Sequence, residues 1–552
     1  MRRHPFLALT CLLIVVALTA CATHSVLTED ARLARIEETW AETPLEVDLS
    51  APPVTVVYPR GPWPDTLLAP SDSIIEGSLP PESLFVLGSV ADPRGTLVIN
   101  GISVPIHPDG GWLAWVPRGP IGILSPGEEY GPGRISTVTI DYRSPSHEQM
   151  QRRILFLDKP EPISGHPPAG FVAKQTQVMV SEQNAKIRCG WPGTYDLFPP
   201  RGTVLDAVGH TGGARKLWKV PLGDGIVGWI EDIYVTESPD ARPLRLDIIP
   251  SVVGKVKRNA YGRELTVIEV PLRYRHAYRI QQVAPDQLEL TVYGAVSQTD
   301  LIIQPFGSRT VDELFWSQVD STTWKLTAQI DPVWFNGWDS AFDDGNDLVW
   351  TIFTTPEIEK RPLEGLRIVV DPGHGGVDYS AIGPTGLPEK TANLMLAQAL
   401  TRELQKAGAE IIPTRTTDES VGLYERVDFA RERQPDLLLS LHHNALGQGI
   451  NPANHHGASV HYNHRHAHGI AEALYASIRN GGWPVNGLRY QDLALARPTF
   501  CPAVLVEAGF MMHPGEEALF RTEAYHADMA TWLREGLETY YAGVRQQQRD
   551  DD

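Results

Sequence analysis

The chain has 552 residues, which is too long for a single hydrophobic core, so several domains of ordinary size are expected. It carries 67 acidic residues against 48 Lys and Arg, and its formal net charge is −19. A protein that coats nucleic acid or an anionic lipid surface needs clustered Lys and Arg, so this balance argues against both classes. We therefore predict an acidic protein without a nucleic-acid partner.

The first 20 residues have the pattern of an export signal. Two arginines precede an apolar stretch that is too short for a comfortable transmembrane helix. The tetrad LTAC at 18–21 resembles the lipobox of bacterial lipoproteins, which implies cleavage before Cys21 and acylation of that cysteine. An ordinary signal peptide with a chance cysteine is the alternative. We predict a signal peptide over 1–20, a tether over 21–52 and a lipid anchor at Cys21. By the same resemblance, the absence of an aspartate after the cysteine favours the outer membrane.

Short alternating strands separated by turn residues follow the tether. Residues 53–160 contain the pairs Asn100-Gly101 and Asp109-Gly110, which supply the positive φ angles of tight hairpin turns. This stretch resembles the immunoglobulin-like modules of exported enzymes. We therefore predict a β-sandwich there.

Two more all-β modules are predicted between residue 168 and residue 358, before the sequence pattern changes to one with helical periodicity. Residues 168–238 resemble bacterial SH3-like wall domains, with Trp218 and Trp229 on either side of a turn as core residues or as a ligand-binding shelf. Pro239 and Pro243 then mark a linker. Residues 242–358 read as further strands and resemble wall-targeting β domains, but a spacer fits them equally well.

Residues 365–545 alternate apolar runs with helical periodicity, which predicts an α/β domain with a mainly parallel sheet flanked by helices. The runs at 366–370, 436–441 and 503–506 read as central strands. Each is followed by a side chain capable of chemistry. The carboxyl ends of parallel strands form the ligand crevice in such folds, so these endings converge if the strands are neighbours.

Four of these side chains are candidates for one site. The first strand leads into Asp371-Pro372-Gly373-His374, the second into His442 and the third into Glu507, while Glu389 opens a predicted helix. Taken alone, Glu389 fits a carboxylate favoured by the helix dipole, and His374 fits an ordinary turn residue. Together, two imidazoles and a carboxylate form the ligand set of many catalytic zinc sites. Such a metal activates water and polarises a carbonyl, and a nearby carboxylate such as Glu507 is needed to carry the proton.

The same domain resembles the zinc-dependent N-acetylmuramoyl-L-alanine amidases of bacterial peptidoglycan. The matching stretches, in the expected order, are IVVDPGHGG, GLPEKTANL, PTRTTDESVGLYERV, LLLSLHHNA, GASVHYN, NGLRY and AVLVEAGFMMHPGEE. The resemblance implies one Zn²⁺ held by His374, Glu389 and His442, with Glu507 as the catalytic glutamate. It also implies cleavage of the amide between N-acetylmuramic acid and the L-alanine of the stem peptide.

Several residues depart from the family pattern or allow two interpretations. His443 stands where the family usually has a small residue, and the register favours His442 as the inward ligand. Asp371 either orients a ligand imidazole or caps the turn. Arg415 and Arg426 either contact carboxylates of the stem peptide or form structural ion pairs. A dense group of histidines is interpreted as solvent-facing rather than as a second metal site: His455, His456, His461, His464, His466 and His468.

Other functions and partners stay open at this point. A zinc peptidase acting on peptidoglycan crosslinks could use the same ligands, and a non-catalytic wall-binding scaffold lipoprotein is the alternative from another class. Some relatives carry a long inserted helix that blocks the zinc, but only 12 residues separate Ala445 from Ala458, so no such plug is predicted. The predicted partners are peptidoglycan, the membrane through the lipid anchor and an activator or divisome protein. The predicted location is the periplasm-facing bacterial cell envelope.

Overall fold

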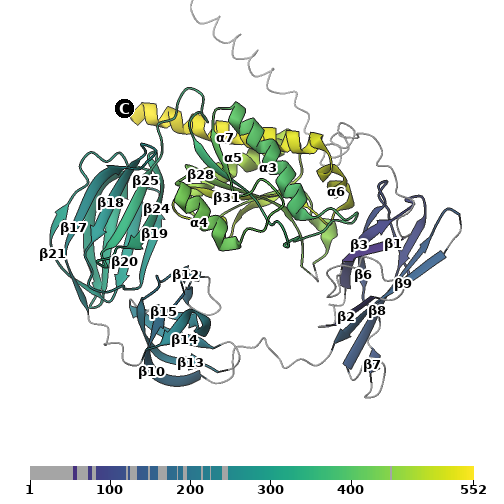
Figure 1. Ribbon diagram of the computed structural model, residues 1–552, viewed down its shortest axis with the longest axis horizontal. Helices are drawn as coiled ribbons and strands as arrows, with labels where there is room; N and C mark the ends of the chain where they lie inside the picture. Colours follow the sequence, from purple (N-terminus) through teal and green to yellow (C-terminus); the bar gives the residue numbers. More distant parts are fainter. Residues whose placement is uncertain are drawn as a thin grey trace, which may run out of the picture.

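The computed structural model describes residues 54–58, 73–76, 83–119, 122–124, 133–146, 149–158, 171–182, 185–189, 195–212, 216–223, 226–238, 246–447 and 450–551 (Figure 1). The predicted signal peptide, the tether with Cys21 and the linker prolines Pro239 and Pro243 lie outside these residues. Among the described residues, no helix is both long and apolar enough to cross a membrane.

The first module consists of two sheets packed face to face. The smaller sheet has the order β1-β3-β6 and the larger the order β2-β9-β8-β4-β5, with β7 paired to β8. The strands are β1 (Val54–Tyr58), β2 (Ser73–Glu76), β3 (Ser83–Val90), β4 (Thr96–Ile99), β5 (Ile102–Val104), β6 (Gly111–Pro117), β7 (Gly122–Leu124), β8 (Gly133–Arg143) and β9 (Gln149–Asp158). The hairpin between β4 and β5 turns at Asn100 and Gly101, whose φ angles are 47° and 82°, as the pair predicts. Below, we call this module the sandwich.

The second module is a single strongly bent sheet with the order β12-β11-β15-β14-β13-β10-β16. Its strands are β10 (Phe171–Val180), β11 (Ile187–Cys189), β12 (Tyr195–Leu197), β13 (Val204–Thr211), β14 (Leu217–Gly223), β15 (Ile226–Glu231) and β16 (Val235–Glu237), with the 3₁₀ turn η1 (Asp232–Tyr234). Trp218 is fully buried, and its Nε1 donates a hydrogen bond of 2.6 Å to Asp232. Trp229 is half-buried beside the exposed ring of Phe171. The core interpretation therefore holds for Trp218 and only partly for Trp229.

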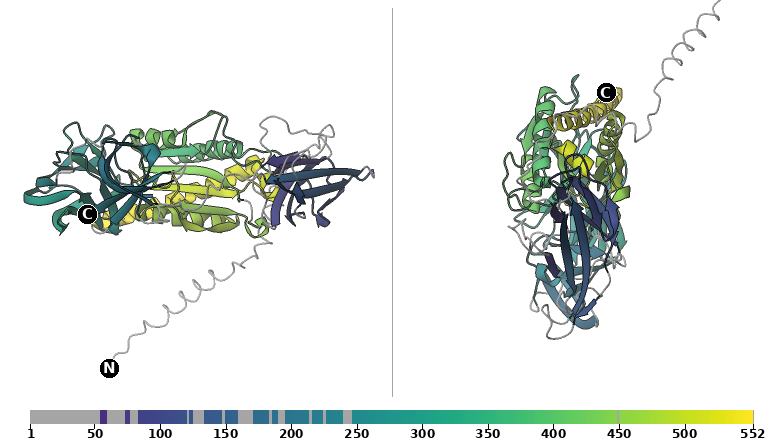
Figure 2. Two further views of the ribbon diagram at one scale, coloured as in Figure 1. Left: turned by 90° about the horizontal axis from the view of Figure 1, so that it is seen from below. Right: turned by 90° about the vertical axis from the view of Figure 1, so that its right-hand side faces the viewer.

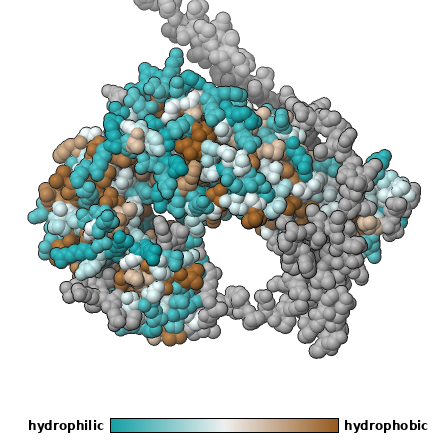
Figure 3. Space-filling view, in the orientation of Figure 1, coloured by the Kyte–Doolittle hydropathy of each residue, from teal (hydrophilic) through white to brown (hydrophobic). Residues whose placement is uncertain are grey.

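The third module stacks two further sheets, with the orders β21-β17-β18-β25-β24 and β19-β20-β23-β22. Its strands are β17 (Asp247–Arg258), β18 (Glu264–Val270), β19 (Tyr278–Ala284), β20 (Gln287–Tyr293), β21 (Ala295–Ile303), β22 (Val311–Asp320), β23 (Thr323–Ile330), β24 (Phe335–Phe342) and β25 (Leu348–Thr354). Trp324 and Trp350 are fully buried in its core. Exposed apolar side chains gather on its outer side (Figure 3), among them Leu301, Ile303 and Phe306.

The C-terminal α/β domain is built on one six-stranded sheet with the order β27-β26-β28-β31-β29-β30. All strand pairs in it are parallel except β29 with β31. The strands are β26 (Arg367–Pro372), β27 (Glu410–Pro413), β28 (Leu437–Asn444), β29 (Ala458–Tyr462), β30 (Val485–Tyr490) and β31 (Ala503–Phe510). The helices are α3 (Glu389–Lys406), α4 (Leu423–Arg433), α5 (Arg465–Gly481), α6 (Pro514–Phe520) and α7 (Glu523–Asp551), with the 3₁₀ turn η2 (Pro452–Asn454).

The central strands of this sheet are apolar on both faces because helices and loops cover both. Leu437 and Leu439 of β28 pack toward α3, α5 and α7, whereas Leu438 packs with Ala430 of α4 on the other face (Figure 1). Buried parallel strands read as continuous apolar runs for this reason. Because β26, β28 and β31 are parallel, their carboxyl ends lie at one edge of the sheet, where the residues that follow them can bring ionisable side chains together.

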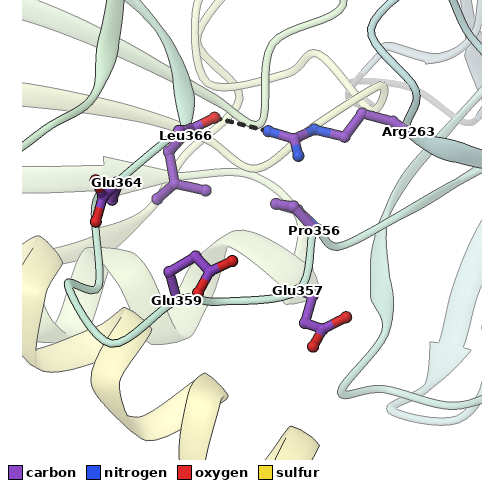
Figure 4. A pocket seen from close by; sticks show the side chains of 7 residues that line it. Arg263, Pro356, Glu357, Glu359, Glu364 and Leu366 are labelled. Atoms are coloured by element: carbon purple, nitrogen blue, oxygen red, sulfur yellow. Dashed lines mark hydrogen bonds between the residues drawn. The ribbon is translucent and has the colours of Figure 1, made fainter.

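The chain bends round so that the first module lies beside the last, at the end opposite the third module (Figures 1 and 2). The third module meets the α/β domain through Arg263, whose Nη2 donates hydrogen bonds of 2.8 Å to Asp436 and to the carbonyl of Gly365. A hollow of about 490 Å³ at this junction is lined by Arg263, Pro356, Glu357, Glu359, Glu364, Gly365 and Leu366 (Figure 4). It lies at the amino end of β26, on the edge of the sheet away from the strand endings.

Candidate metal centre

Three of the predicted site residues converge at the carboxyl edge of the sheet. His442 lies on β28, His374 is the second residue after the end of β26, and Glu389 is the first residue of α3. One ligand atom of each lies within 4.8 Å of the others. Glu389 Oε1 is 3.3 Å from Nε2 of His374 and 3.0 Å from Nδ1 of His442. Two imidazoles and one carboxylate around a common point are the donor set of catalytic zinc sites.

The loop that carries His374 requires an unusual backbone. His374 has φ of +59°, in the left-handed region that side chains other than glycine rarely adopt. Gly373 has no room for a side chain, because a Cβ there would lie 2.1 Å from Cε1 of His442. A glycine is therefore needed at position 373 so that the imidazoles of His374 and His442 can approach each other, with ring centroids 4.9 Å apart.

Two buried arginines hold this loop in place. Arg415 donates to the carbonyls of Pro372 and Gly373 at 2.9 Å, and Arg426 donates to those of Pro372 at 2.8 Å and His374 at 2.7 Å. Each arginine is only 3% exposed. Buried side chains that are bonded to the backbone in this way do not face a peptide substrate. The predicted structural ion pair is found for Arg426, which pairs with Asp371, whereas Arg415 binds backbone carbonyls instead.

Asp371 balances the positive charge of Arg426 and takes no part in the hydrogen bonds of the His374 and His442 imidazoles. It is fully buried and accepts hydrogen bonds from Arg426 at 2.6 Å, Thr414 at 2.5 Å and Ser440 at 2.7 Å. Both interpretations from the sequence, an imidazole partner and a turn cap, are wrong. Burial opposes the charged form, but Arg426 and the two hydroxyl groups lower the pKa of Asp371 below its usual value.

The electrostatics of the three candidate ligands are dominated by Glu389. Its carboxylate is 3% exposed, and although burial disfavours its charge, the two imidazoles hold its pKa well below the usual range. Burial alone would lower the pKa of His374, yet hydrogen bonds to Glu389 and Asp378 raise it to about 9. The pKa of His442 is also raised, because Glu389 and Glu507 outweigh the effect of burial. A cation bound here would have to displace these protons.

The neighbouring His443 points to the other side of β28. It is 1% exposed, and its Nδ1 lies 2.7 Å from Asn393 Oδ1, while Nε2 lies 3.2 Å from the hydroxyl of Tyr525. Burial lowers its pKa to about 3. Strand alternation thus separates the two adjacent histidines into one at the centre and one in the core.

Glu507 lies beside the centre on the next strand. It is the register partner of His442 in the parallel pair of β28 and β31. Its Oε2 is buried and accepts no hydrogen bond from any residue that the structure describes. Burial raises the pKa of Glu507 to about 7, although the charge of His442 acts in the opposite direction. A buried carboxylate oxygen without a partner, next to a cluster of metal-ligating groups, is suited to proton transfer.

Comparison with known proteins identifies the family of this domain. The family model described as N-acetylmuramoyl-L-alanine amidase matches residues 368–539. The protein named probable cell wall amidase LytH of Staphylococcus aureus is 31% identical over 230 residues, which cover 41% of this chain and 72% of that protein. The chain belongs to the N-acetylmuramoyl-L-alanine amidase family.

Solved structures of amidases are also similar to part of this chain. The N-acetylmuramoyl-L-alanine amidase AmiC2 of Nostoc punctiforme is 28% identical, and the alignment covers 32% of this chain and 98% of that one, with a TM-score of 0.30. The amidase of Clostridium difficile 630 is 26% identical, covering 32% of this chain and 97% of that one, with a TM-score of 0.31.

The dense histidines of the amidase domain are not solvent-facing, which corrects the prediction. His461 is 5% exposed and lies 2.8 Å from the hydroxyl of Ser459. The rings of His464 and His466 both pack against Trp338 of β24. His464 and His466 are half-buried because β24 of the third module packs against them, which no local pattern indicates.

Two residues of the amidase centre escaped the sequence analysis. Asn393 donates to Glu389 at 3.2 Å from one helical turn further along α3, so an i, i+4 spacing from Glu389 could have indicated it. Asp378 lies 2.7 Å from Nδ1 of His374, where it can orient the imidazole in the way first expected of Asp371. It sits in an irregular loop, so no periodic signal pointed to it.

Proposed function

We propose that this amidase holds one zinc ion on His374, Glu389 and His442 and hydrolyses the amide between N-acetylmuramic acid and the L-alanine of the stem peptide. The observation that carries the proposal is the gathering of three ligand atoms within 4.8 Å beside the unpartnered Oε2 of Glu507. The family match and the name of the Staphylococcus aureus relative, a cell wall amidase, support peptidoglycan as the substrate.

The residues present fit a zinc ion by their chemistry. Nitrogen and carboxylate donors suit zinc, and three protein ligands leave a position for water or substrate. Glu389 and His442 are held before any ion binds, through Asn393 and the strand register respectively. When bound, zinc would lower the pKa of a water molecule and polarise the substrate carbonyl.

Glu507 is the proposed proton carrier. Its Oε2 takes the proton from the attacking water as the new carbon–oxygen bond forms, and then delivers it to the amide nitrogen as the carbon–nitrogen bond breaks. The products are a lactyl carboxylate on the sugar and a free amine on the peptide. A pKa of about 7 allows the carboxyl group both to accept and to donate a proton near neutral pH.

Arg415 and Arg426 act on the backbone rather than on substrate. Their hydrogen bonds to the carbonyls of residues 372–374 fix the loop that presents His374. Asp378 holds the outer nitrogen of the same imidazole, which sets its orientation. These contacts preorganise the site, so less ordering is required when the ion and the substrate bind.

Location outside the cytoplasm belongs to the same proposal. A cell-wall substrate requires an envelope location, and acylation of Cys21, the last residue of the lipobox-like tetrad, would anchor the chain to the outer membrane with its domains facing the periplasm. Release of stem peptides only after addition of an envelope extract would identify an activator or divisome protein as a partner. Labelling of the chain with a radioactive fatty acid, and its loss in a Cys21→Ala variant, tests the anchor.

The deciding experiment measures peptide release from purified sacculi by the chain from Ala22 onward with zinc, beside the Glu507→Gln variant. We expect intact stem peptides that begin with L-alanine, and a rate lower by about 10²- to 10⁴-fold in the variant with its zinc content unchanged. Shortened peptides still attached to sugar would instead identify a peptidase. Sacculus binding with zinc but without release, even after addition of an envelope extract, would indicate a scaffold.

A further inference from the structure

The sheet β1-β3-β6 of the sandwich is apolar on both faces. On β3, Leu84 and Val86 point into the core of the sandwich, while Phe85 and Leu87 point the opposite way. On β6, Trp112 points into the core and Trp115 away from it. A sheet with one solvated face alternates apolar with polar residues, so this pattern indicates that the second face is covered.

The amidase domain covers that face. Phe85 and Leu87 are only 1% and 2% exposed, and they share a hydrophobic cluster with Phe510 and Met512, which are 1% and 3% exposed. We call this cluster the docking cluster. Its other members are Val57, Tyr58, Leu113 and Trp115 of the sandwich and Ile382 and Leu446 of the amidase domain. Figures 1 and 2 show the sandwich beside α6, at the carboxyl edge of the amidase sheet.

The amidase members of the docking cluster come from the segments that carry the centre. Leu446 follows His442 by four residues, and Phe510 follows Glu507 by three. Ile382 is next to Ala381, whose carbonyl accepts from the backbone of Glu389 at 2.9 Å and whose N–H donates to its carboxylate at 3.4 Å.

The contact is tight at its margin. A Cβ built at Gly111, the first residue of β6, would lie 3.3 Å from the Cβ atoms of both Pro384 and Pro514. Pro384 belongs to the loop that leads from Ile382 to Glu389, and Pro514 opens α6. The same loop is held from α6 by Glu517, which accepts from the backbone of Thr385 at 2.8 Å. The loop before Glu389 is therefore fixed between the sandwich and α6.

We propose that the sandwich is a positioning module for hydrolysis, which keeps Glu389 and Glu507 in place through the docking cluster. This inference rests on the proposed function. Without the sandwich, Phe510 and Met512 would face water and the loop before Glu389 would lose one of its two supports. If the loop before Glu389 is loose, binding of the ion must also order the loop, which weakens the affinity for the ion. If Glu507 is misplaced, the proton transfer is slowed, whereas the affinity for the substrate changes little.

The test compares Leu87→Glu with Ile102→Glu in the full chain from Ala22 onward. Leu87 faces the amidase domain and leaves the sandwich core intact, whereas Ile102, on the other sheet, is 41% exposed. For Leu87→Glu we expect at least a tenfold lower kcat with KM within twofold of the wild type, and at least a tenfold weaker zinc affinity by chelator competition. Ile102→Glu and the conservative Leu87→Met should resemble the wild type. Unchanged kcat and zinc affinity in Leu87→Glu would overturn the proposal.

A covalent lock separates positioning from autoinhibition and does not depend on how well Leu87→Glu folds. A Cβ at Gly111 would lie 3.3 Å from that of Pro514, just under the range of about 3.5–4.5 Å found in disulfides, so a small backbone shift lets a Gly111→Cys/Pro514→Cys variant form one, with crosslinking verified by mass after mild oxidation. We expect the oxidised form to keep at least half of the activity of its reduced form. Loss of activity only on oxidation, or a rise in activity in Leu87→Glu, would mean that the sandwich must leave, which contradicts the proposal. Absence of peptide release by the wild type, even after addition of an envelope extract, would instead reject the proposed function, while the zinc affinities still test the positioning.

Discussion

Replacement of Asp371 by Asn tests whether the buried ion pair under the His374 loop supports the amidase domain. Asp371 is fully buried and 2.6 Å from Arg426, which is itself 3% exposed, so the substitution leaves a buried guanidinium without its counter-charge. Breaking a buried pair in this way costs about 3–5 kcal/mol. For a domain of this size each kcal/mol lowers the melting temperature by about 2–4 °C, which gives a decrease of roughly 6–20 °C.

The measurement is scanning calorimetry of the full chain with excess chelator, so that metal binding does not mask the change. Asp428→Asn is the matched control, because Asp428 pairs with Arg431 on α4, the helix that carries Arg426, and both of these side chains are about half exposed, at 54% and 49%. An exposed pair contributes about 0–1 kcal/mol, so this variant should melt close to the wild type. If Asp371→Asn melted with the control, the ion pair would not be what supports the loop.

Three further outcomes follow from the same geometry. Zinc affinity should weaken as the pH falls from 8 to 6, because the pKa of His374 is raised to about 9 and zinc must displace its proton. Chelator competition should show about a tenfold loss of affinity per pH unit for each displaced proton. An affinity that does not change with pH would contradict this prediction. His443→Phe should keep zinc but lower the melting temperature, since Asn393 loses its buried partner at a cost of about 1–3 kcal/mol, whereas His442→Phe should lose zinc. Burial lowers the pKa of His466 to about 3, so its neutral ring contributes stability that is complete above about pH 6.5 and is lost as the pH falls toward 3. His466→Phe should therefore flatten the acid side of the melting-temperature profile, and an unchanged slope would count against the assignment.

Local patterns in the sequence were enough to find most of the centre. The apolar runs before Asp371, His442 and Glu507 indicated buried parallel strands, and those strands are neighbours in the sheet. The predicted helix begins at Glu389, as the change of periodicity indicated. Alternation along β28 distinguished His442 from His443, because adjacent residues of a strand must face opposite sides.

Periodicity was less reliable for individual side chains. The spacing of Leu394, Ala397, Leu400 and Leu404 predicts one buried face for the helix that begins at Glu389. Leu394 is nevertheless half-buried, while Leu396, outside this stripe, is fully buried. The difference arises because α3 packs on both the sheet and α7, so its buried surface is wider than one stripe.

What the sequence determined by itself is the order of strands and helices and the residue types at their ends, since both depend on interactions between near neighbours in the chain. Tertiary structure alone decided which partner each buried polar group received. Asp371 pairs with Arg426, 55 residues away, and His466 packs against Trp338 of another module. It also decided that the second apolar face of β3 meets Phe510 beside the centre. A buried charge or an apolar face requires some partner, but its identity depends on which distant surfaces come together when the chain folds.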